Sequence, residues 1–253
     1  MDLAKKPAIV TGGGSGLGAE TARRFAREGA RVSVIDRDGA AAERIAGEIG
    51  GLAIALDVAD AAAAEAAFAE ARARHGAARV LVNCAGIAPA RRIVGREGAM
   101  ALSDFAEVIR VNLIGSFNML RLAAAEMSGL VPLADGERGV IISTASVAAF
   151  EGQIGQAAYA ASKAGIVGMM LPAARELARS GIRVLTIAPG LIATPLLLNM
   201  PQEVQDSLAA TVPFPSRFGR PDEFASLALH LVENVLINGE VIRLDGALRM
   251  QAR

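Results

Sequence analysis

The hydrophobic positions of this chain form short continuous runs separated by longer amphipathic stretches. Runs such as Val80-Leu81-Val82 and Val140-Ile141-Ile142 have no polar position on either face, which is typical of strands in a parallel sheet covered on both sides. Such strands are predicted near residues 7–12, 30–36, 52–57, 79–84, 139–145, 182–188 and 240–244. Helical periodicity fills most of the gaps. The pattern therefore predicts an α/β fold with a doubly wound, seven-stranded parallel sheet and helices on both faces.

Nothing in the sequence divides the chain into separate domains. The 253 residues contain no linker, internal repeat or low-complexity segment, so we expect one domain over residues 1–253. Residues 191–219 form an apolar, proline-punctuated insertion before the last helix and strand. We predict that this insertion is a lid over the substrate, and a subunit interface is the alternative.

Composition narrows the possible functions. Lysine and arginine number 26, as do aspartate and glutamate, so no surface for nucleic acid or for an acidic membrane is expected. The apolar runs are strand-length or alanine-rich and broken by charges, and none predicts a membrane span. His75 and His230 are far apart and no Cys/His cluster exists. We therefore expect no metal site and assign both histidines to surface or packing roles.

Two features concern the cellular compartment. Cys84 is the only cysteine, which excludes an internal disulfide and fits a reducing environment. The first strand is predicted from residue 7, which leaves no room for a secretory signal or transit peptide before it. A cytoplasmic location is therefore expected.

A glycine-rich turn follows the first predicted strand and precedes a helix. Within Thr11-Gly-Gly-Gly-Ser-Gly-Leu-Gly18, the glycines Gly12, Gly16 and Gly18 have the spacing G-x-x-x-G-x-G. Glycine allows a sharp turn and close approach of a ligand, and the free N–H groups at a helix N-terminus bind phosphate. The turn therefore predicts a dinucleotide pyrophosphate site. A tight connection without a ligand is the alternative.

Asp36 ends the second predicted strand, eighteen residues after Gly18. A carboxylate at this place can accept hydrogen bonds from the adenosine ribose and repels a 2′-phosphate, which favours NAD over NADP. Arg37 is the complication, because a guanidinium there could bind that phosphate. Asp36 could also cap the helix predicted from Gly39.

Tyr159, the only tyrosine, lies four residues before Lys163 and thirteen after Ser146. If the chain is helical from Ala157 onward, the phenol and the ammonium group share one face. A neighbouring cation lowers the pKa of a phenol from its usual value of about 10. The pair then supplies a general acid or base for a carbonyl or alcohol oxygen. A chance pair on an exposed helix is the alternative.

Together these motifs resemble the short-chain dehydrogenase/reductase family over essentially the whole chain. The resemblance rests on Thr11–Gly18, Asp57-Val58, Asn83-Cys84-Ala85-Gly86, Asn112, Ser146, Tyr159-x-x-x-Lys163 and Pro189-Gly190 with Thr194. It implies a Rossmann fold that binds NAD. The cofactor contacts it implies are Gly12, Ser15, Gly16, Leu17, Gly18, Asp36, Asp57, Val58, Asn83, Cys84, Ala85, Gly86, Tyr159, Lys163, Pro189, Gly190 and Thr194.

The same resemblance implies a role for each residue of the reaction centre. Tyr159 would be the general acid/base, and Ser146 would hydrogen-bond the substrate oxygen. Lys163 would bind the nicotinamide ribose and lower the pKa of Tyr159, and Asn112 would hold a water in the proton relay. Cys84 departs from the family pattern, because much of the family has a second asparagine at this position. The thiol is then a possible site of oxidation.

A closer resemblance, to the type II 3-hydroxyacyl-CoA dehydrogenases of this family, lies in residues 143–159, 212–217 and 238–246. It implies NAD-dependent oxidation of the 3-hydroxyl group of acyl-CoA thioesters, including short and 2-methyl-branched ones. It also implies a homotetramer, and it places Gln153 beside the substrate. The mitochondrial members carry an N-terminal extension that this sequence does not show, so a bacterial relative is expected.

Other functions remain open. A 3-oxoacyl-carrier-protein reductase or a hydroxysteroid dehydrogenase would use the same fold, although Asp36 disfavours the NADPH that the carrier-protein enzymes typically use. A non-catalytic scaffold is the alternative from another class. Arg91, Arg92 and Arg96 follow Gly86 and could reach CoA phosphates. An exposed charged loop without a ligand is the other interpretation of these arginines.

Overall fold

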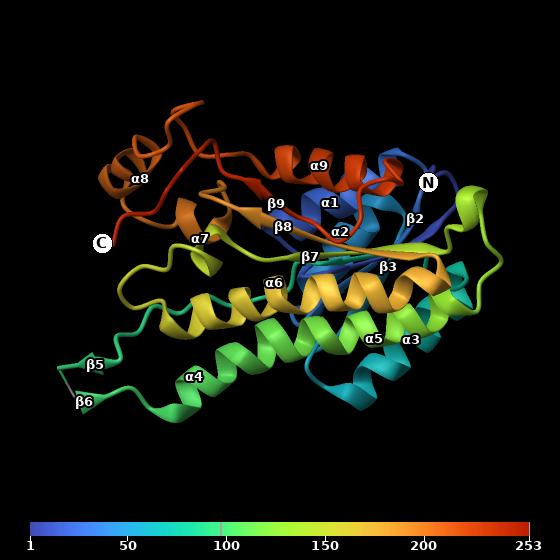
Figure 1. The fold of residues 1–253 in the computed structure, drawn as a ribbon, viewed down its shortest axis with the longest axis horizontal. Coiled ribbons are helices and arrows are strands. Elements are labelled where there is room, and N and C mark those ends of the chain that lie inside the picture. Colours follow the sequence, from blue (N-terminus) through green and yellow to red (C-terminus); the bar gives the residue numbers. More distant parts are fainter. Residues whose placement is uncertain (97, 253) are drawn as a thin grey trace.

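The predicted sheet is present in full. In the computed structural model, which describes residues 1–96 and 98–252 and all of their side chains except that of Leu196, seven parallel strands form one sheet (Figure 1). The strand order is β3-β2-β1-β4-β7-β8-β9. The strands are β1 (Pro7–Thr11), β2 (Arg31–Asp36), β3 (Leu52–Ala55), β4 (Val80–Asn83), β7 (Gly139–Thr144), β8 (Ile182–Pro189) and β9 (Val241–Leu244). All seven predicted strands are confirmed, and each predicted end lies within two residues of the observed one.

Helices cover both faces of the sheet, as predicted. One layer contains α1 (Gly16–Arg27), α2 (Gly39–Ile49) and α9 (Pro221–Glu233); the other contains α3 (Ala61–His75), α5 (Gly115–Ser128) and α6 (Ala157–Leu177). Phe25 and Phe224 are fully buried in the first layer, and Met119 and Phe68 in the second. Because the strands are buried on both faces, they read as continuous apolar runs in the sequence.

One helical run continues through a wider turn. The helix α4 (Leu102–Ile109) passes through a π-helical turn, η1 (Arg110–Ile114), directly into α5. By length and composition alone, Leu102–Ser128 is apolar enough to cross a membrane, but its most apolar stretch is 56% buried in the protein. Much of α5 packs on the sheet, which is typical of the core helix of a globular domain. The π turn carries Asn112, so it determines where this predicted site residue lies.

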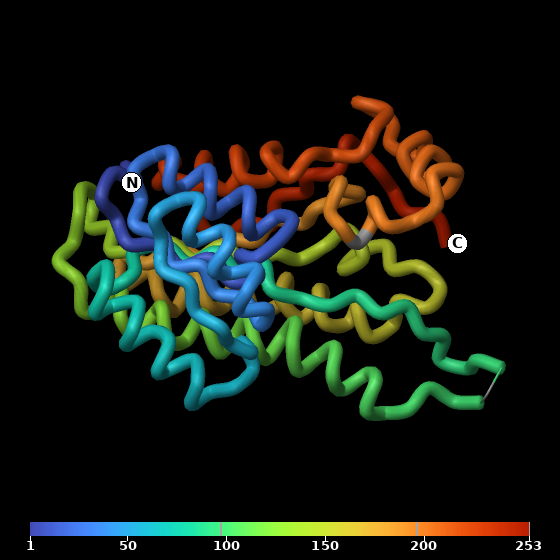
Figure 2. The backbone as a smooth tube through the Cα atoms, turned by 180° about the vertical axis from the view of Figure 1, so that it is seen from behind, coloured from blue at the N-terminus to red at the C-terminus, as the bar shows by residue number. Residues whose placement is uncertain are grey.

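The crevice between β1 and β4 is where the strand order reverses, and ligands of such sheets bind beyond the carboxyl ends of the strands at this point. A short hairpin of β5 (Val94–Gly95) and β6 (Gly98–Ala99), which the sequence pattern did not predict, projects at this end of the molecule (Figure 1). Two helices in the predicted insertion, α7 (Pro195–Leu198) and α8 (Gln202–Ala209), and the C-terminal tail lie at the same end (Figure 2). Three short turns, η2 (Ala134–Gly136), η3 (Val147–Ala149) and η4 (Ala178–Ser180), complete the described elements.

Candidate active site

The glycine-rich turn packs directly against the chain that follows β4. Gly12 has a φ of +61°, and a methyl group added to it would lie 2.7 Å from the backbone nitrogen of Ala85. The hydroxyl of Thr11 accepts a hydrogen bond from that nitrogen at 3.3 Å. Gly16 has a φ of +51° and faces Thr194, because a methyl group there would lie 3.3 Å from Thr194 Cγ2. Glycine is thus required for both the turn and the close approach.

Asp36 stands beside this turn at the end of β2. Its Oδ2 accepts a hydrogen bond from the backbone nitrogen of Gly14 at 2.9 Å, and its Oδ1 accepts one from that of Asp38 at 3.0 Å. The helix cap is Asp38, which accepts from the Ala41 nitrogen at 3.1 Å. The prediction that Asp36 could cap this helix is therefore wrong, since the chain extends two residues further before α2 begins. Contact of the Asp36 carboxylate with a ribose stays a prediction.

The segment after β4 mixes internal and cleft-facing groups. The side chain of Asn83 is 2% exposed and donates to the Ser116 carbonyl and the Ser143 hydroxyl, at 3.3 and 3.4 Å. It therefore joins β4 to β7 and α5, and contact of Asn83 with the cofactor stays a prediction. The Cys84 thiol accepts a hydrogen bond from the Thr144 hydroxyl at 3.6 Å. Burial raises the pKa of this thiol to about 11, so the thiolate needed for oxidation is scarce.

The loop after β3 is fastened to the turn η1. An oxygen of Asp57 lies 2.9 Å from the guanidinium of Arg110. Burial by itself raises the pKa of Asp57, but hydrogen bonds from Arg110 and from the Ala59 nitrogen outweigh that effect and hold the pKa below its usual value. Val58 is buried, and a methyl group on Gly115 would lie 2.6 Å from it. The Asp57 carboxylate thus stays partly exposed, while the Val58 side chain serves packing. Contact of both residues with the cofactor stays a prediction.

Ser146 and Tyr159 meet at the carboxyl end of β7. The Ser146 oxygen accepts a hydrogen bond from the Ala148 nitrogen at 3.1 Å and so caps η3. Its hydroxyl lies close enough to the Tyr159 phenol to affect the pKa of that group. Burial raises the pKa of Tyr159, and the Ser146 hydroxyl partly offsets that rise. The helix predicted from Ala157 is confirmed.

Lys163 follows Tyr159 by one helical turn but binds elsewhere. Its Nζ donates to the backbone carbonyl of Thr144 at 2.7 Å and lies 5.8 Å from the centroid of the Tyr159 ring. Burial lowers the pKa of Lys163 to about 8. The structure therefore differs from the expectation that Lys163 lowers the pKa of Tyr159. Burial has the largest effect on that pKa and raises it, because Nζ is directed to the Thr144 carbonyl instead of the phenol. Thr144 carries no sequence signal for this role, since it acts through its backbone.

Asn112 is fully buried in the π turn. Its amide oxygen accepts from the Ile87 nitrogen at 2.8 Å, and its amide nitrogen donates to the Ile87 carbonyl and the Ser162 hydroxyl, at 2.9 and 3.0 Å. A methyl group on Gly86 would lie 3.1 Å from Asn112 Oδ1 and 3.5 Å from Lys163 Nζ. Asn112 therefore fixes the backbone of Ile87, next to Gly86. A water held by Asn112 stays a prediction.

The remaining predicted contacts lie along the same edge. Gly190 follows β8, and its nitrogen donates to the Leu244 carbonyl at 2.9 Å. Thr194 is the residue before α7 and faces the glycine turn. The side-chain amide of Gln153 donates to the backbone carbonyl of Gln251 at 3.1 Å. Gln153 thus contacts the C-terminal tail, and its contact with a substrate stays a prediction.

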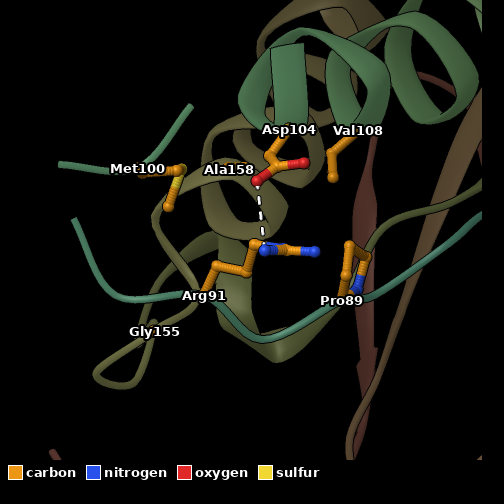
Figure 3. Close-up of a pocket in the computed structure, with 7 residues that line it drawn as sticks. All are labelled: Pro89, Arg91, Met100, Asp104, Val108, Gly155 and Ala158. Atoms are coloured by element: carbon orange, nitrogen blue, oxygen red, sulfur yellow. Dashed lines mark ion pairs between the residues drawn. The ribbon is translucent and has the colours of Figure 1, made fainter. Parts of the chain in front are cut away.

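The three arginines after Gly86 differ in their surroundings. Arg91 pairs with Asp104 at 3.3 Å, beside a cavity of about 10 Å³ between α4 and the approach to Tyr159 (Figure 3). Its charge is therefore already balanced. Arg92 is exposed, and Arg96 adjoins the projecting hairpin and is exposed as well. Contact of these residues with CoA phosphates stays a prediction.

No metal site is found in the part of the chain that the structure describes, where no three His, Cys, Asp or Glu side chains gather closely enough. His75 is buried at the C-terminus of α3, near the amino ends of the strands and away from the reaction centre. His230 is exposed on α9. Both positions fit the packing and surface roles expected from the sequence.

Comparison with known proteins identifies the class to which this site belongs. A family model described as short chain dehydrogenase matches residues 6–205, which include the glycine-rich turn, Ser146, Tyr159 and Lys163. The chain therefore belongs to the short chain dehydrogenase family and is an oxidoreductase that uses NAD.

Its relatives narrow the comparison further. The chain is 54% identical to 3-hydroxyacyl-CoA dehydrogenase type-2 from Bos taurus, over 96% of this chain and 95% of that protein, and 51% identical to the human protein of the same name over the same shares. It is also similar to a crystal structure of 3-hydroxyacyl-CoA dehydrogenase type-2 from Mycobacterium avium, with a TM-score of 0.94, 42% identity and 98% of each chain covered. The predicted resemblance to the type II group is thus confirmed.

Proposed function

We propose that the chain oxidises the 3-hydroxyl group of 3-hydroxyacyl-CoA thioesters to a 3-oxo group, including short and 2-methyl-branched acyl chains. The observation that carries the proposal is the placement of Tyr159 beside Ser146, with Lys163 one turn further along α6. These residues lie at the carboxyl ends of the strands, in the crevice that the glycine-rich turn borders. The names of the relatives support the choice of substrate.

The residues around the crevice fit a dinucleotide. The turn from Gly12 to Gly18 has five glycines, which leave the backbone open at the N-terminus of α1, where phosphate groups bind. Asp36 supplies a carboxylate for ribose hydroxyls and is held in place by the Gly14 nitrogen. When NAD is bound, it supplies the acceptor for the hydride that leaves the substrate carbon.

Tyr159 and Ser146 handle the other product of the oxidation, which is the hydroxyl proton. The phenolate oxygen of Tyr159 takes this proton, while the Ser146 hydroxyl donates a hydrogen bond to the substrate oxygen and keeps it in line. In the structure the pKa of Tyr159 is raised, so the phenol holds its proton and is ready to act as the acid of the reverse reaction. The oxidation therefore requires that Tyr159 first lose a proton, which alkaline pH favours.

Lys163 and Asn112 position groups around this step. Lys163 is anchored on the Thr144 carbonyl at 2.7 Å and places a cation beside the Tyr159 ring, where it can bind a ribose hydroxyl of the cofactor. Asn112 fixes residues 86 and 87 through the Ile87 backbone. The gap that Gly86 leaves open allows Lys163 and Asn112 to approach the same space.

We also propose that the chain forms a homotetramer and acts in the cytoplasm. Ile114, Phe117 and Leu171 on the outer side of η1, α5 and α6 are 51%, 50% and 39% exposed, and apolar side chains of this kind gather at subunit interfaces. The single cysteine fits a reducing compartment. Light scattering on the purified protein tests the tetramer, and cell fractionation tests the location.

The decisive experiment follows NADH formation with 3-hydroxybutyryl-CoA, its 2-methyl analogue, a hydroxysteroid and a 3-hydroxyacyl carrier protein, each offered NAD or NADP. We expect turnover of the CoA esters with NAD and a loss of at least about a thousandfold in Tyr159→Phe, because the general base is removed. NADH binding by Tyr159→Phe should persist. Turnover of the steroid or the carrier-protein ester in preference to the CoA esters would replace the proposed substrate, and turnover unaffected by Tyr159→Phe would remove the proposed mechanism.

A further inference from the structure

A cluster of four charged side chains joins the C-terminal part of the chain to the loop between Ser146 and Tyr159. Arg243, on β9, donates from two nitrogens to the two carboxylate oxygens of Glu151, at 2.9 and 3.1 Å. Its third nitrogen donates to Asp245 at 2.6 Å. Arg249 lies 3.4 Å from both carboxylates. We call Glu151, Arg243, Asp245 and Arg249 the tail clamp.

The backbone of the tail makes further bonds to the same loop. The Met250 nitrogen donates to Glu151 at 3.1 Å, the Gln153 amide donates to the Gln251 carbonyl at 3.1 Å, and the Ile154 nitrogen donates to the Ala252 carbonyl at 3.1 Å. These contacts join residues nearly a hundred positions apart. The tail therefore holds the loop at successive positions from Glu151 to Ile154.

The clamp is better shielded than an ordinary surface ion pair. The side chains of Arg243, Glu151 and Asp245 are 23%, 22% and 8% exposed. Arg243 also donates to the carbonyl of Leu248, whose side chain is buried. Exposed single pairs contribute little, whereas bidentate pairs in a network with restricted solvent can hold a definite geometry. The clamp thus has the geometry needed to fix the loop in one position.

The same tail touches two other segments of the site. A methyl group on Gly190 would lie 2.8 Å from Asp245 Cβ, and one on Gly246 would lie 2.6 Å from Val212 Cγ1. Gly190 is one of the predicted cofactor contacts, and Val212 belongs to the predicted lid, residues 191–219. The tail therefore lies between the lid and the loop that joins the two catalytic side chains.

The sequence of that loop explains why one residue matters. Glu151 is the only charged residue between Ser146 and Tyr159. The loop begins at Ser146, which caps η3, and ends at Tyr159 in the first turn of α6. A shift in its middle is therefore transmitted to both ends, and the relative placement of catalytic groups matters at displacements of about 1 Å.

We propose that the tail clamp positions this loop for catalysis, with Glu151 and Arg243 as positioning residues for Ser146, Tyr159 and the acyl part of the substrate. The proposal rests on the proposed function for its kinetic test, because acyl-CoA is the substrate assayed. It assigns the C-terminal tail a place in the wall of the active site rather than a purely structural role. Neither Glu151 nor Arg243 touches the reacting atoms.

The test compares Glu151→Gln with a matched control, Glu126→Gln. Glutamine keeps the shape of the side chain and removes the charge that binds Arg243. Glu126, on α5, also forms a close ion pair with an arginine, Arg72, at 2.7 Å, and it lies at the opposite end of the strands. Arg249→Gln is a graded variant, since Arg249 is mostly exposed and lies further from its partners. All three variants are studied as the full chain.

We expect Glu151→Gln to lower kcat/KM for 3-hydroxybutyryl-CoA by about tenfold while the Kd of NADH changes by less than about twofold, because the clamp acts on the substrate side. Arg249→Gln should show a smaller loss, and Glu126→Gln none. Amide hydrogen exchange should accelerate in residues 150–156 as well as in 248–252 of Glu151→Gln. Equal losses in kcat/KM for Glu151→Gln and Glu126→Gln would indicate a general loss of stability and overturn the proposal.

The remaining outcomes separate this proposal from the proposed function. Faster amide hydrogen exchange confined to residues 248–252, with unchanged kcat/KM, would show that the loop does not depend on the tail clamp. This result would overturn the proposal. If the unmodified protein turned over no CoA ester, the proposed function would fail. Exchange would then decide alone, and unchanged protection of residues 150–156 in Glu151→Gln would overturn the clamp.

Discussion

The guanidinium of Arg110 lies 2.9 Å from a carboxylate oxygen of Asp57 and joins two segments that the sequence places far apart. The same guanidinium donates to both oxygens of Glu107, at 2.7 and 2.8 Å. Arg110 is the first residue of the π turn that carries Asn112. The loop predicted to contact the cofactor and the turn predicted to serve the proton relay are thus joined by one ion pair.

We predict that Arg110→Gln weakens cofactor binding and leaves the chemical step nearly unchanged. Without the guanidinium, the Asp57 carboxylate loses its fixed orientation and the balance of its charge. A partly exposed charged pair contributes about 1 kcal/mol, so the Kd of NADH should rise about fivefold. Titration of NADH fluorescence measures this, and the absence of tryptophan from the chain leaves that signal clear.

Arg72→Gln is the control for Arg110→Gln. Arg72 also forms one close ion pair, with Glu126 at 2.7 Å, but at the opposite end of the strands. NADH affinity should be the same in Arg72→Gln as in the unmodified protein. An unchanged affinity in Arg110→Gln would show that Asp57 needs no fixed partner to bind the cofactor.

Lys163 leads to a prediction about stability and pH. Burial lowers the pKa of Lys163 from 10.5 to about 8, so between these pH values the unfolded chain holds a proton that the folded protein has released. The free energy of unfolding therefore rises with pH across this window, by up to about 3 kcal/mol. Below pH 8 both states hold the proton, and this contribution is constant.

Urea unfolding at pH 7.5 and pH 10 measures the effect, with Lys163→Met as the reference, because Tyr159 and Cys84 also titrate at alkaline pH. The free energy of unfolding of the unmodified protein, relative to that of Lys163→Met, should be higher at pH 10 than at pH 7.5. A difference that is the same at both pH values would mean that Lys163 is not desolvated as the structure indicates.

Ser146→Ala should shift the pH dependence of oxidation. The neighbouring Ser146 hydroxyl acts to lower the pKa of Tyr159 against the opposing effect of burial. Its removal should raise that pKa, so the rising limb of kcat against pH should move to higher pH, with a loss of about a hundredfold at neutral pH. Steady-state rates from pH 6 to 10 test this. An unshifted limb with a lower plateau would instead assign Ser146 to substrate binding alone.

Much of the fold was predictable because its signals are local. Continuous apolar runs predicted the strands, and a glycine-rich turn between a strand and a helix predicted the sharp turn at Gly12. The spacing of Tyr159 and Lys163 predicted one helical face. Assembly of the site followed from topology, since the carboxyl ends of parallel strands share one edge.

What escaped prediction depends on contacts distant in sequence or made by the backbone. The acceptor that anchors Lys163 is the backbone carbonyl of Thr144. Every residue type has such a carbonyl, so no sequence pattern reveals this contact. The raised pKa of Tyr159 depends on how deeply the ring is buried. Arg110 and Glu151 look like surface charges in the sequence, and only the folded chain brings them to Asp57 and Arg243.

Cys84 provides a last prediction, on reactivity. The sequence suggested an oxidation site, but burial raises the pKa of the thiol to about 11, although its hydrogen bond from Thr144 and the nearby Lys163 both act to lower it. At pH 8 about one thiol in a thousand would be ionised, so alkylation should be about a hundredfold slower than for an ordinary cysteine. Iodoacetamide labelling, followed by mass spectrometry, should leave the folded protein unmodified and label the urea-unfolded chain fully. Rapid labelling of the folded protein at pH 8 would mean that the cleft beside Ala85 opens far enough to expose the thiol, and Cys84 would then return as a site of oxidation.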